Sequence, residues 1–242
     1  MIEKIEGIVV NEMDYSESSK ILSILTKDRG IISVISKGCK KLKSDLRSVS
    51  TKLIYGDFNV VYKENKLSTL ISVDVKDVFK KIKLDIEKIS YASYLLDLSY
   101  QVGKQQYSIT LYELLISALK KINDDFDSLV ITNIVELKYL DLLGVMPMLE
   151  GCVCCGSKNL IATISSYKGG YLCSKCIGNE KLVTAKTIKL IRLFYYVDIS
   201  KISKLDIDEK SKYEINKFLD EYYDRYTGLY LKSKDFLKLI NE

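Results

Sequence analysis

Four cysteines with a paired spacing are the residues of this chain best suited to chemistry. Cys152 and Cys155 form one C-x-x-C pair, Cys173 and Cys176 form a second, and seventeen residues separate the two pairs. A two-residue gap lets the chain turn back so that both thiolates reach one ion at about 2.3 Å, and a separation of roughly 15 to 20 residues is typical of a four-cysteine zinc ribbon. Gly156 directly follows the first pair and can adopt the positive φ of such a turn. The spacing therefore predicts a tetrahedral zinc site.

The same cysteines admit three other interpretations. Four buried thiols can act as small hydrophobic side chains, a C-x-x-C pair can be a redox site, and four thiolates can hold an iron–sulfur cluster. Two C-x-x-C pairs at ribbon-like spacing, outside a βαβ setting, favour zinc over all three. Because four thiolates close the coordination shell, the predicted role of one Zn²⁺ ion is structural. Cys154 and Cys39 are then non-ligands.

Composition argues against several classes of enzyme. The 242 residues include no histidine, which excludes Ser-His-Asp triads, Cys-His pairs and histidine-ligated catalytic zinc. The sequence has no phosphate-binding G-x-x-x-x-G-K-[S/T] loop, and no acid pair stands out as a two-metal nuclease site. We therefore expect a binding protein without catalytic residues. No apolar run reaches the roughly 18 to 20 residues of a membrane span, and the start lacks a basic signal-peptide head, so a cytoplasmic location is expected.

A lysine-rich segment is the candidate binding surface. Residues 36–52, SKGCKKLKSDLRSVSTK, hold six basic residues against one acid, although the whole chain has a net charge of only +5. A loop of this charge can neutralise nucleic-acid phosphates and bind in a salt-dependent way. The alternative is a solvated loop in a lysine-rich protein. The six basic residues are Lys37, Lys40, Lys41, Lys43, Arg47 and Lys52.

A second basic stretch runs through the metal segment and beyond it. Its residues are Lys158, Lys168, Lys175, Lys181, Lys186, Lys189 and Arg192. This stretch either extends a nucleic-acid path or, as charge runs more often do, forms a solvated face. In the first 80 residues, Tyr15, Tyr55, Phe58 and Tyr62 can stack bases if they point outward, but packing in a core is the more common role.

The elements that must position these residues fall into two groups, which predicts an α+β protein. The first 80 residues contain β-branched or aromatic runs at 6–13, 19–26, 30–38, 52–64 and 67–77, separated by turns. Five strands of this length fit a small barrel, either an OB-fold or an SH3-like barrel. From about residue 81 helical spacing takes over, at 82–100, 111–122, 127–143, from Thr184 onward, at 208–227 and at 232–240, with the cysteine segment at about 150–180. Thr184 is the predicted N-cap of its helix, and Gly144 and Gly228 are the predicted ends of the helices at 127–143 and 208–227.

Seven short motifs, in this order, carry a resemblance to a known family. They are E-G-I-V-V, Y-S-E-S-S-K, L-T-K-D-R-G, S-K-G-C-K-K-L-K-S, L-L-G-V-M-P, C-V-C-C-G and G-G-Y-L-C-S-K-C. Each fragment is short, but together they cover nearly the whole chain at a specific spacing. The sequence thus resembles the RecO proteins of bacterial recombinational DNA repair.

The resemblance implies an N-terminal OB-fold at 1–80 and an all-α domain at 81–242 that carries the zinc module as an insertion. It also implies binding of single- and double-stranded DNA, annealing of complementary strands, and cooperation with RecR to load RecA onto DNA coated by single-stranded DNA-binding protein. That coating protein would dock through its acidic tail. Carried over by motif, the DNA contacts would be Lys37, Lys40, Lys41, Lys43 and Arg47, and the zinc ligands Cys152, Cys155, Cys173 and Cys176.

Two rival functions are also compatible with the sequence. A zinc-ribbon adaptor that binds only protein partners would have the same cysteines and a merely solvated loop. A redox enzyme would cycle a disulfide in one C-x-x-C pair. In the family resemblance, Cys39 stands where a small residue is more usual, and the full cysteine set is not universal.

Overall fold

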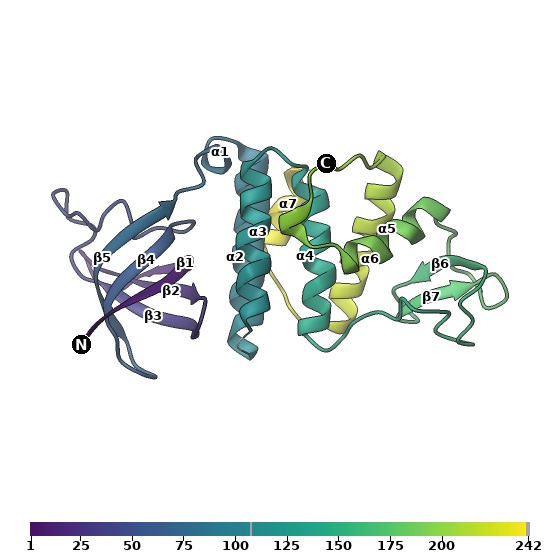
Figure 1. The fold of residues 1–242 in the computed structure, drawn as a ribbon, viewed down its shortest axis with the longest axis horizontal. Coiled ribbons are helices and arrows are strands. Elements are labelled where there is room, and N and C mark those ends of the chain that lie inside the picture. Colours follow the sequence, from purple (N-terminus) through teal and green to yellow (C-terminus); the bar gives the residue numbers. More distant parts are fainter. Residues whose placement is uncertain (107, 241–242) are drawn as a thin grey trace. The chain divides into compact units, whose positions relative to one another are not determined.

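The computed structural model describes residues 1–106 and 108–240, and its elements follow the chain as drawn in Figure 1. The chain forms two compact units. Unit 1 combines Met1–Asp124 with the segment that begins at Leu231, and unit 2 is Asp125–Tyr230. Both α-helices and β-strands are present, as the sequence predicts, and the cysteine segment lies in unit 2.

Five strands of unit 1 close into a barrel with the order β1-β2-β3-β5-β4. The strands are β1 (Ile2–Asp14), β2 (Lys20–Thr26), β3 (Gly30–Ser36), β4 (Tyr55–Val61) and β5 (Ser68–Asp77). All neighbours pair antiparallel except β3 and β5, which are parallel and pair only at Val34 and Ile35. The five predicted strand segments are confirmed, with ends shifted by a few residues.

Alternating side chains explain why these runs form a barrel. In β4, Phe58 and Val60 are buried while Asp57 and Asn59 are partly exposed, because successive side chains of a strand point to opposite faces. The inward residues build one apolar core with β-branched and leucine side chains from the other strands. That core consists of Ile5, Val9, Leu22, Ile24, Ile32, Val34, Ile54, Phe58, Val60 and Leu70.

Four helices belong to unit 1: α1 (Lys80–Lys83), α2 (Ile86–Gln105), α3 (Ile109–Asn123) and α7 (Lys232–Ile240). Helix α2 packs against α3, α7 and the strands β1 and β3. The single helix predicted from Ile82 to Tyr100 is interrupted. The Asp85 side chain accepts hydrogen bonds from the N–H groups of Glu87 and Lys88, so a new helix begins there and Ile86 points to solvent.

Unit 2 contains the helices α4 (Ser128–Leu142), α5 (Ala185–Tyr196) and α6 (Glu209–Tyr226) and a 3-10 turn at Ile199–Lys201. Between α4 and α5, the strands β6 (Ile161–Ser165) and β7 (Gly170–Cys173) form an antiparallel hairpin. Helix α4 is followed by Gly144 at a φ of 71°, as the sequence predicts for its C-terminus.

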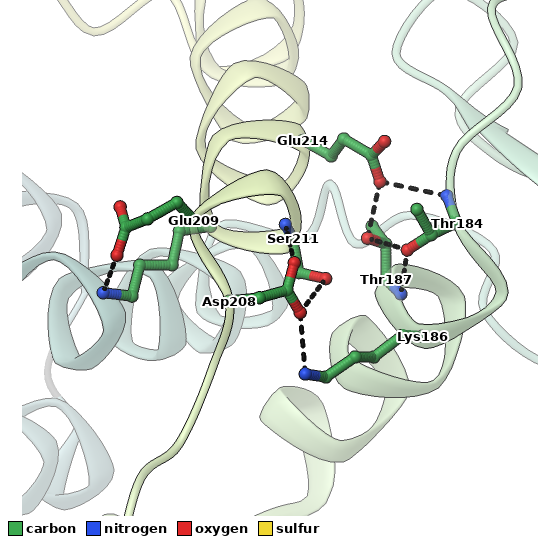
Figure 2. A network of polar contacts seen from close by, with 8 residues as sticks. Thr184, Lys186, Thr187, Asp208, Glu209, Ser211 and Glu214 are labelled. Carbon is green, nitrogen blue, oxygen red and sulfur yellow. Dashed lines mark hydrogen bonds and ion pairs between the residues drawn. The ribbon is translucent and has the colours of Figure 1, made fainter.

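A polar network joins the start of α5 to the start of α6 (Figure 2). Thr184 caps α5 by accepting a hydrogen bond from the N–H group of Thr187, which confirms the predicted cap. The Glu214 carboxylate accepts from the Thr184 N–H at 3.0 Å and from the Thr187 hydroxyl at 2.6 Å. Lys186 pairs with Asp208 at 2.7 Å. These contacts hold the helix that follows the cysteine hairpin.

Within residues 1–106 and 108–240, none of the helices combines the length and the apolar composition needed to cross a bilayer.

Candidate metal centre and basic loop

The four predicted ligands come from two tight turns of unit 2. The first lies between α4 and β6, where the N–H of Gly156 donates to the carbonyl oxygen of Cys152 at 2.8 Å. Gly156 has a φ of 72°, which an L side chain rarely adopts, so glycine suits this turn. The second turn follows β7 directly, and there the N–H of Cys176 donates to the carbonyl oxygen of Cys173 at 3.0 Å. Each turn brings its two cysteines to the same side.

The hairpin then brings the two turns together. The Sγ atoms of Cys152, Cys155, Cys173 and Cys176 all lie within 4.8 Å of one another, and those of Cys155 and Cys173 are 3.7 Å apart. Zn²⁺ bound to four thiolates at about 2.3 Å needs sulfur–sulfur separations of roughly 3.8 Å, so the donor set and its size fit a tetrahedral ion. Cys154 is exposed and outside the group, and Cys39 is buried in unit 1.

The acidity of the thiols also fits a cation at this position. Burial acts to raise the pKa of Cys152, but hydrogen bonds from the backbone N–H groups of Cys173 and Cys155 help to lower it to about 6. The neighbouring thiols of Cys155, Cys173 and Cys152 raise the pKa of Cys176. One thiolate therefore forms readily and the last resists ionisation. A bound divalent ion removes this conflict, because it replaces the protons with one central positive charge.

The cysteine hairpin has its own small apolar core and is fastened to the chain that leaves α4. Cys152, Leu172 and Cys173 are buried together, with Val153, Ile161 and Ile177 packed around them. Gly170 and Met148 form a parallel bridge, in which the Met148 N–H donates to Gly169 and the Tyr171 N–H donates to Met148.

The basic loop, residues 37–54 between β3 and β4, is anchored at several points. The hydroxyls of Ser36 and Ser50 are 2.7 Å apart and buried, and the N–H of Gly38 donates to the Ser19 hydroxyl at 3.1 Å. Cys39 is buried, and Leu46 and Val49 pack against the barrel core. The loop therefore has a fixed path although it contains no strand or helix.

Its basic side chains differ in what they contact. Lys37, Lys41, Lys43 and Arg47 are exposed, and within the described part of the chain none of them forms an ion pair. Lys40 is only partly exposed and pairs with Asp14 at 2.7 Å, and this contact lowers the pKa of the Asp14 carboxyl. The structure thus gathers four exposed cations on one loop, while Lys40 ties the loop to the end of β1 and Lys52 is half-buried.

The second basic stretch is partly neutralised. Three of its cations form ion pairs with acids of unit 2: Lys168 with Glu180, Lys186 with Asp208 and Arg192 with Glu150. Its remaining residues, Lys158, Lys175, Lys181 and Lys189, are exposed. This stretch therefore offers less free positive charge per residue than the basic loop.

The aromatic residues considered for base stacking differ in their exposure. Phe58 and Tyr55 are buried, Tyr15 is exposed, and Tyr62 is half-buried with the Arg29 guanidinium 4.3 Å above its ring. The sequence gives no sign of the Arg29 contact, because the two residues lie on different connections of the barrel.

Comparisons with known proteins agree along nearly the whole chain. The family model "Recombination protein O N terminal" matches residues 1–79 and the model "Recombination protein O C terminal" matches residues 83–235. The DNA repair protein RecO of Bacillus pumilus is 36% identical over 98% of this chain and 94% of its own length. RecO of Bacillus subtilis is 35% identical, and RecO of Listeria monocytogenes is 34% identical, over the same shares.

Proposed function

The chain belongs to the RecO family of DNA repair and recombination proteins, and from this premise we propose that it is a DNA-binding recombination mediator. It binds single- and double-stranded DNA, anneals complementary strands, and works with RecR to load RecA onto DNA coated by single-stranded DNA-binding protein. The location that suits this role is the cytoplasm, at the nucleoid.

The basic loop is the observation that carries the DNA-binding proposal. Its four exposed cations, Lys37, Lys41, Lys43 and Arg47, stand on an anchored loop, so little backbone conformational entropy is lost when a phosphate backbone binds. Lys40 belongs to the same proposed surface but shares its charge with Asp14. Binding of this kind neutralises phosphates and releases counterions without reading bases.

Strand annealing follows from the same charges. Two complementary strands repel each other through their phosphates, and a cationic surface that holds both weakens this repulsion. No group on the protein has to break or form a covalent bond, so we propose no catalytic residue. Contact with the acidic tail of the coating protein also needs a basic surface, and the chain has one in each unit.

We propose an OB-fold for residues 1–80 and a helical domain for 81–242. The order β1-β2-β3-β5-β4 in a closed five-stranded barrel supports the first assignment. The helices α1, α2, α3 and α7 pack in the same compact unit as the barrel.

We propose that Cys152, Cys155, Cys173 and Cys176 hold one structural Zn²⁺ ion. When bound, the ion supplies a fixed tetrahedral centre and no open position for a substrate. The four cysteines then act by clamping the two turns of the hairpin, which keeps the chain between α4 and α5 in one conformation.

Annealing of two complementary oligonucleotides, one carrying a donor fluorophore and the other an acceptor, tests this function by energy transfer. We expect the protein to speed duplex formation at low salt, and to do so less after Lys37, Lys41 and Lys43 are all changed to alanine. If neither oligonucleotide binds the protein at low salt, the proposal of DNA binding is wrong, and an adaptor that binds only proteins is the function to test next.

A further inference from the structure

A hollow lies on the barrel of unit 1, separate from the basic loop. Its volume is about 330 Å³, near the lower end of the roughly 300–1,000 Å³ typical of small-ligand sites. It opens between the first half of β3 and the connection from β4 to β5, residues 62–67. The residues that matter for its chemistry are Arg29, Tyr62, Lys63, Asn65 and Lys66.

The barrel topology explains why this place is open. Strands β3 and β5 pair only at Val34 and Ile35, in the second half of β3. The first half, from Gly30 to Ser33, therefore has no β5 residue beside it, and the β4–β5 connection forms the opposite wall. Ile31 and Leu67 add apolar atoms to a lining that is otherwise mostly polar. The hollow is thus a consequence of the short pairing between β3 and β5.

A flat cationic surface stands at one wall of the hollow. The Arg29 guanidinium lies 4.3 Å from the Tyr62 ring centroid and pairs with the Glu3 carboxylate at 2.7 Å. Tyr62 itself packs against the barrel core. Contacts with a ring and with an acid thereby hold the guanidinium in place before any ligand arrives.

The backbone on both sides of the hollow is fixed as well. The Thr26 hydroxyl accepts from the Arg29 N–H at 3.0 Å and donates to the Gly30 carbonyl oxygen at 2.7 Å, which sets the turn that carries Arg29. Across the hollow, the Lys63 N–H donates to the Ser68 hydroxyl at 3.1 Å. Asn65 has a φ of 53°, a left-handed conformation that asparagine tolerates better than most residues.

Two free cations stand at the rim. Lys63 and Lys66 are exposed, and neither forms an ion pair with any residue that the structure describes. Glu64 lies between them in sequence and is also exposed. A flat guanidinium surface with apolar atoms beside it and two lysines at the edge match a nucleotide, which combines an aromatic base with a phosphate.

We propose that this hollow binds one nucleotide of a single DNA strand, with its base stacked on the Arg29 guanidinium and its phosphates beside Lys63 and Lys66. The inference rests on the proposed DNA-binding function and adds a base-contacting subsite to the phosphate-binding loop. Stacking tolerates any base, so the subsite favours unpaired over paired DNA without reading sequence.

Two fluorescent thymidine oligomers of equal length test the subsite with the full chain. One is ordinary, and the other carries abasic sugars throughout, so both present the same phosphates. Loss of one stacked base lowers affinity by roughly 5- to 150-fold. We expect the wild-type protein to prefer the ordinary oligomer, and we expect Arg29→Ala to remove most of that preference.

Three further variants separate stacking from charge and from folding. Arg29→Lys keeps the charge but lacks the plane, so it should lose the preference for bases while the salt dependence stays the same. Lys63→Ala with Lys66→Ala should weaken binding of both oligomers about equally. Lys80→Ala, an exposed lysine on α1 outside the hollow, is the matched control and should behave as wild type.

The outcomes distinguish this proposal from the function on which it rests. If wild-type protein binds both oligomers equally well, or if the Arg29 variants keep the full preference for bases, the subsite proposal is wrong although DNA binding stands. If wild-type protein binds neither oligomer at low salt, the proposed function fails and the subsite fails with it. A thermal melt of each variant checks that the barrel is folded.

Discussion

Removing the exposed lysines of the basic loop should change how salt affects DNA binding. Lys37, Lys41, Lys43 and Arg47 are the four exposed cations of the loop, and none of them forms an ion pair with a residue that the structure describes. If each neutralises one phosphate of a single strand, log K falls with log salt at a slope of about −2.8, since each contact contributes about −0.7. The triple variant Lys37→Ala, Lys41→Ala, Lys43→Ala retains one such cation and should show a slope of about −0.7.

These slopes translate into a large difference in affinity. Over a fourfold rise in salt, the loop contribution to wild-type affinity should fall by about 50-fold, and that of the triple variant by only about 3-fold. Fluorescence anisotropy with a labelled thymidine oligomer at several sodium chloride concentrations measures both slopes. Other contacts, including those in the hollow, add a constant amount to both, so the difference between the slopes is the quantity to compare.

A charge-neutral control comes from Lys40, the loop lysine that pairs with Asp14. Changing Lys40→Gln together with Asp14→Asn removes an ion pair of 2.7 Å without altering the net charge. We expect the slope of this double variant to match that of wild type, because a lysine engaged by Asp14 releases few counterions from DNA. A triple variant with an unchanged slope would refute the reasoning, and so would a wild-type slope near zero.

Three other predictions concern the metal centre and the stability of each unit. Cys155→Ser should lower bound zinc, measured by elemental analysis, from about one ion per chain to none and reduce the melting temperature, whereas Cys154→Ser should keep the ion. Hydrogen bonds from the Tyr55 hydroxyl and from Lys76 lower the pKa of Glu6 to about 2, below its ordinary value of 4.5. The contribution of Glu6 to stability is therefore present above pH 4.5 and is lost as the pH falls toward 2. Glu6→Gln should therefore cost about 1–2 kcal/mol in urea unfolding at pH 7, after a discount for partial exposure, and the cost should vanish in acid. Gly170→Ala places a Cβ only 2.5 Å from the carbonyl oxygen of Met148, so the bridge should open and destabilise unit 2 by about 1–3 kcal/mol, again read from urea unfolding.

Local patterns were enough to predict most elements of the fold. The strand segments, the cap at Thr184 and the helix ends near Gly144 and Gly228 depend on residues that are neighbours in sequence. The interruption before α2 was missed because the apolar spacing continues through Ile86, whereas the capping carboxylate of Asp85 decides where the helix starts. Capping is worth about 1 kcal/mol, which is enough to override one exposed isoleucine.

The site residues also differ in whether local sequence predicts their contacts. The cysteine cluster was predictable because C-x-x-C is a local geometry and a hairpin joins the two pairs. The pairing of Lys40 with Asp14 and the position of Arg29 over Tyr62 were not, since each joins residues from different connections of the barrel. The return of α7 to α2 was equally hidden, because an amphipathic helix does not specify which surface it will cover.

Because α7 packs against α2 but is made much later, α2 must wait for this partner during protein synthesis. Helix α2 packs against both α3 and α7, yet all of Asp125–Tyr230 lies between α3 and α7 in the chain. A ribosome that adds about 5–20 residues per second takes on the order of 5–20 s to translate such an interval. Throughout that time the face of α2 that α7 later covers is exposed to solvent. Chaperone demand should therefore peak in this interval, and a ribosome stalled before residue 231 would release a chain that is prone to aggregate.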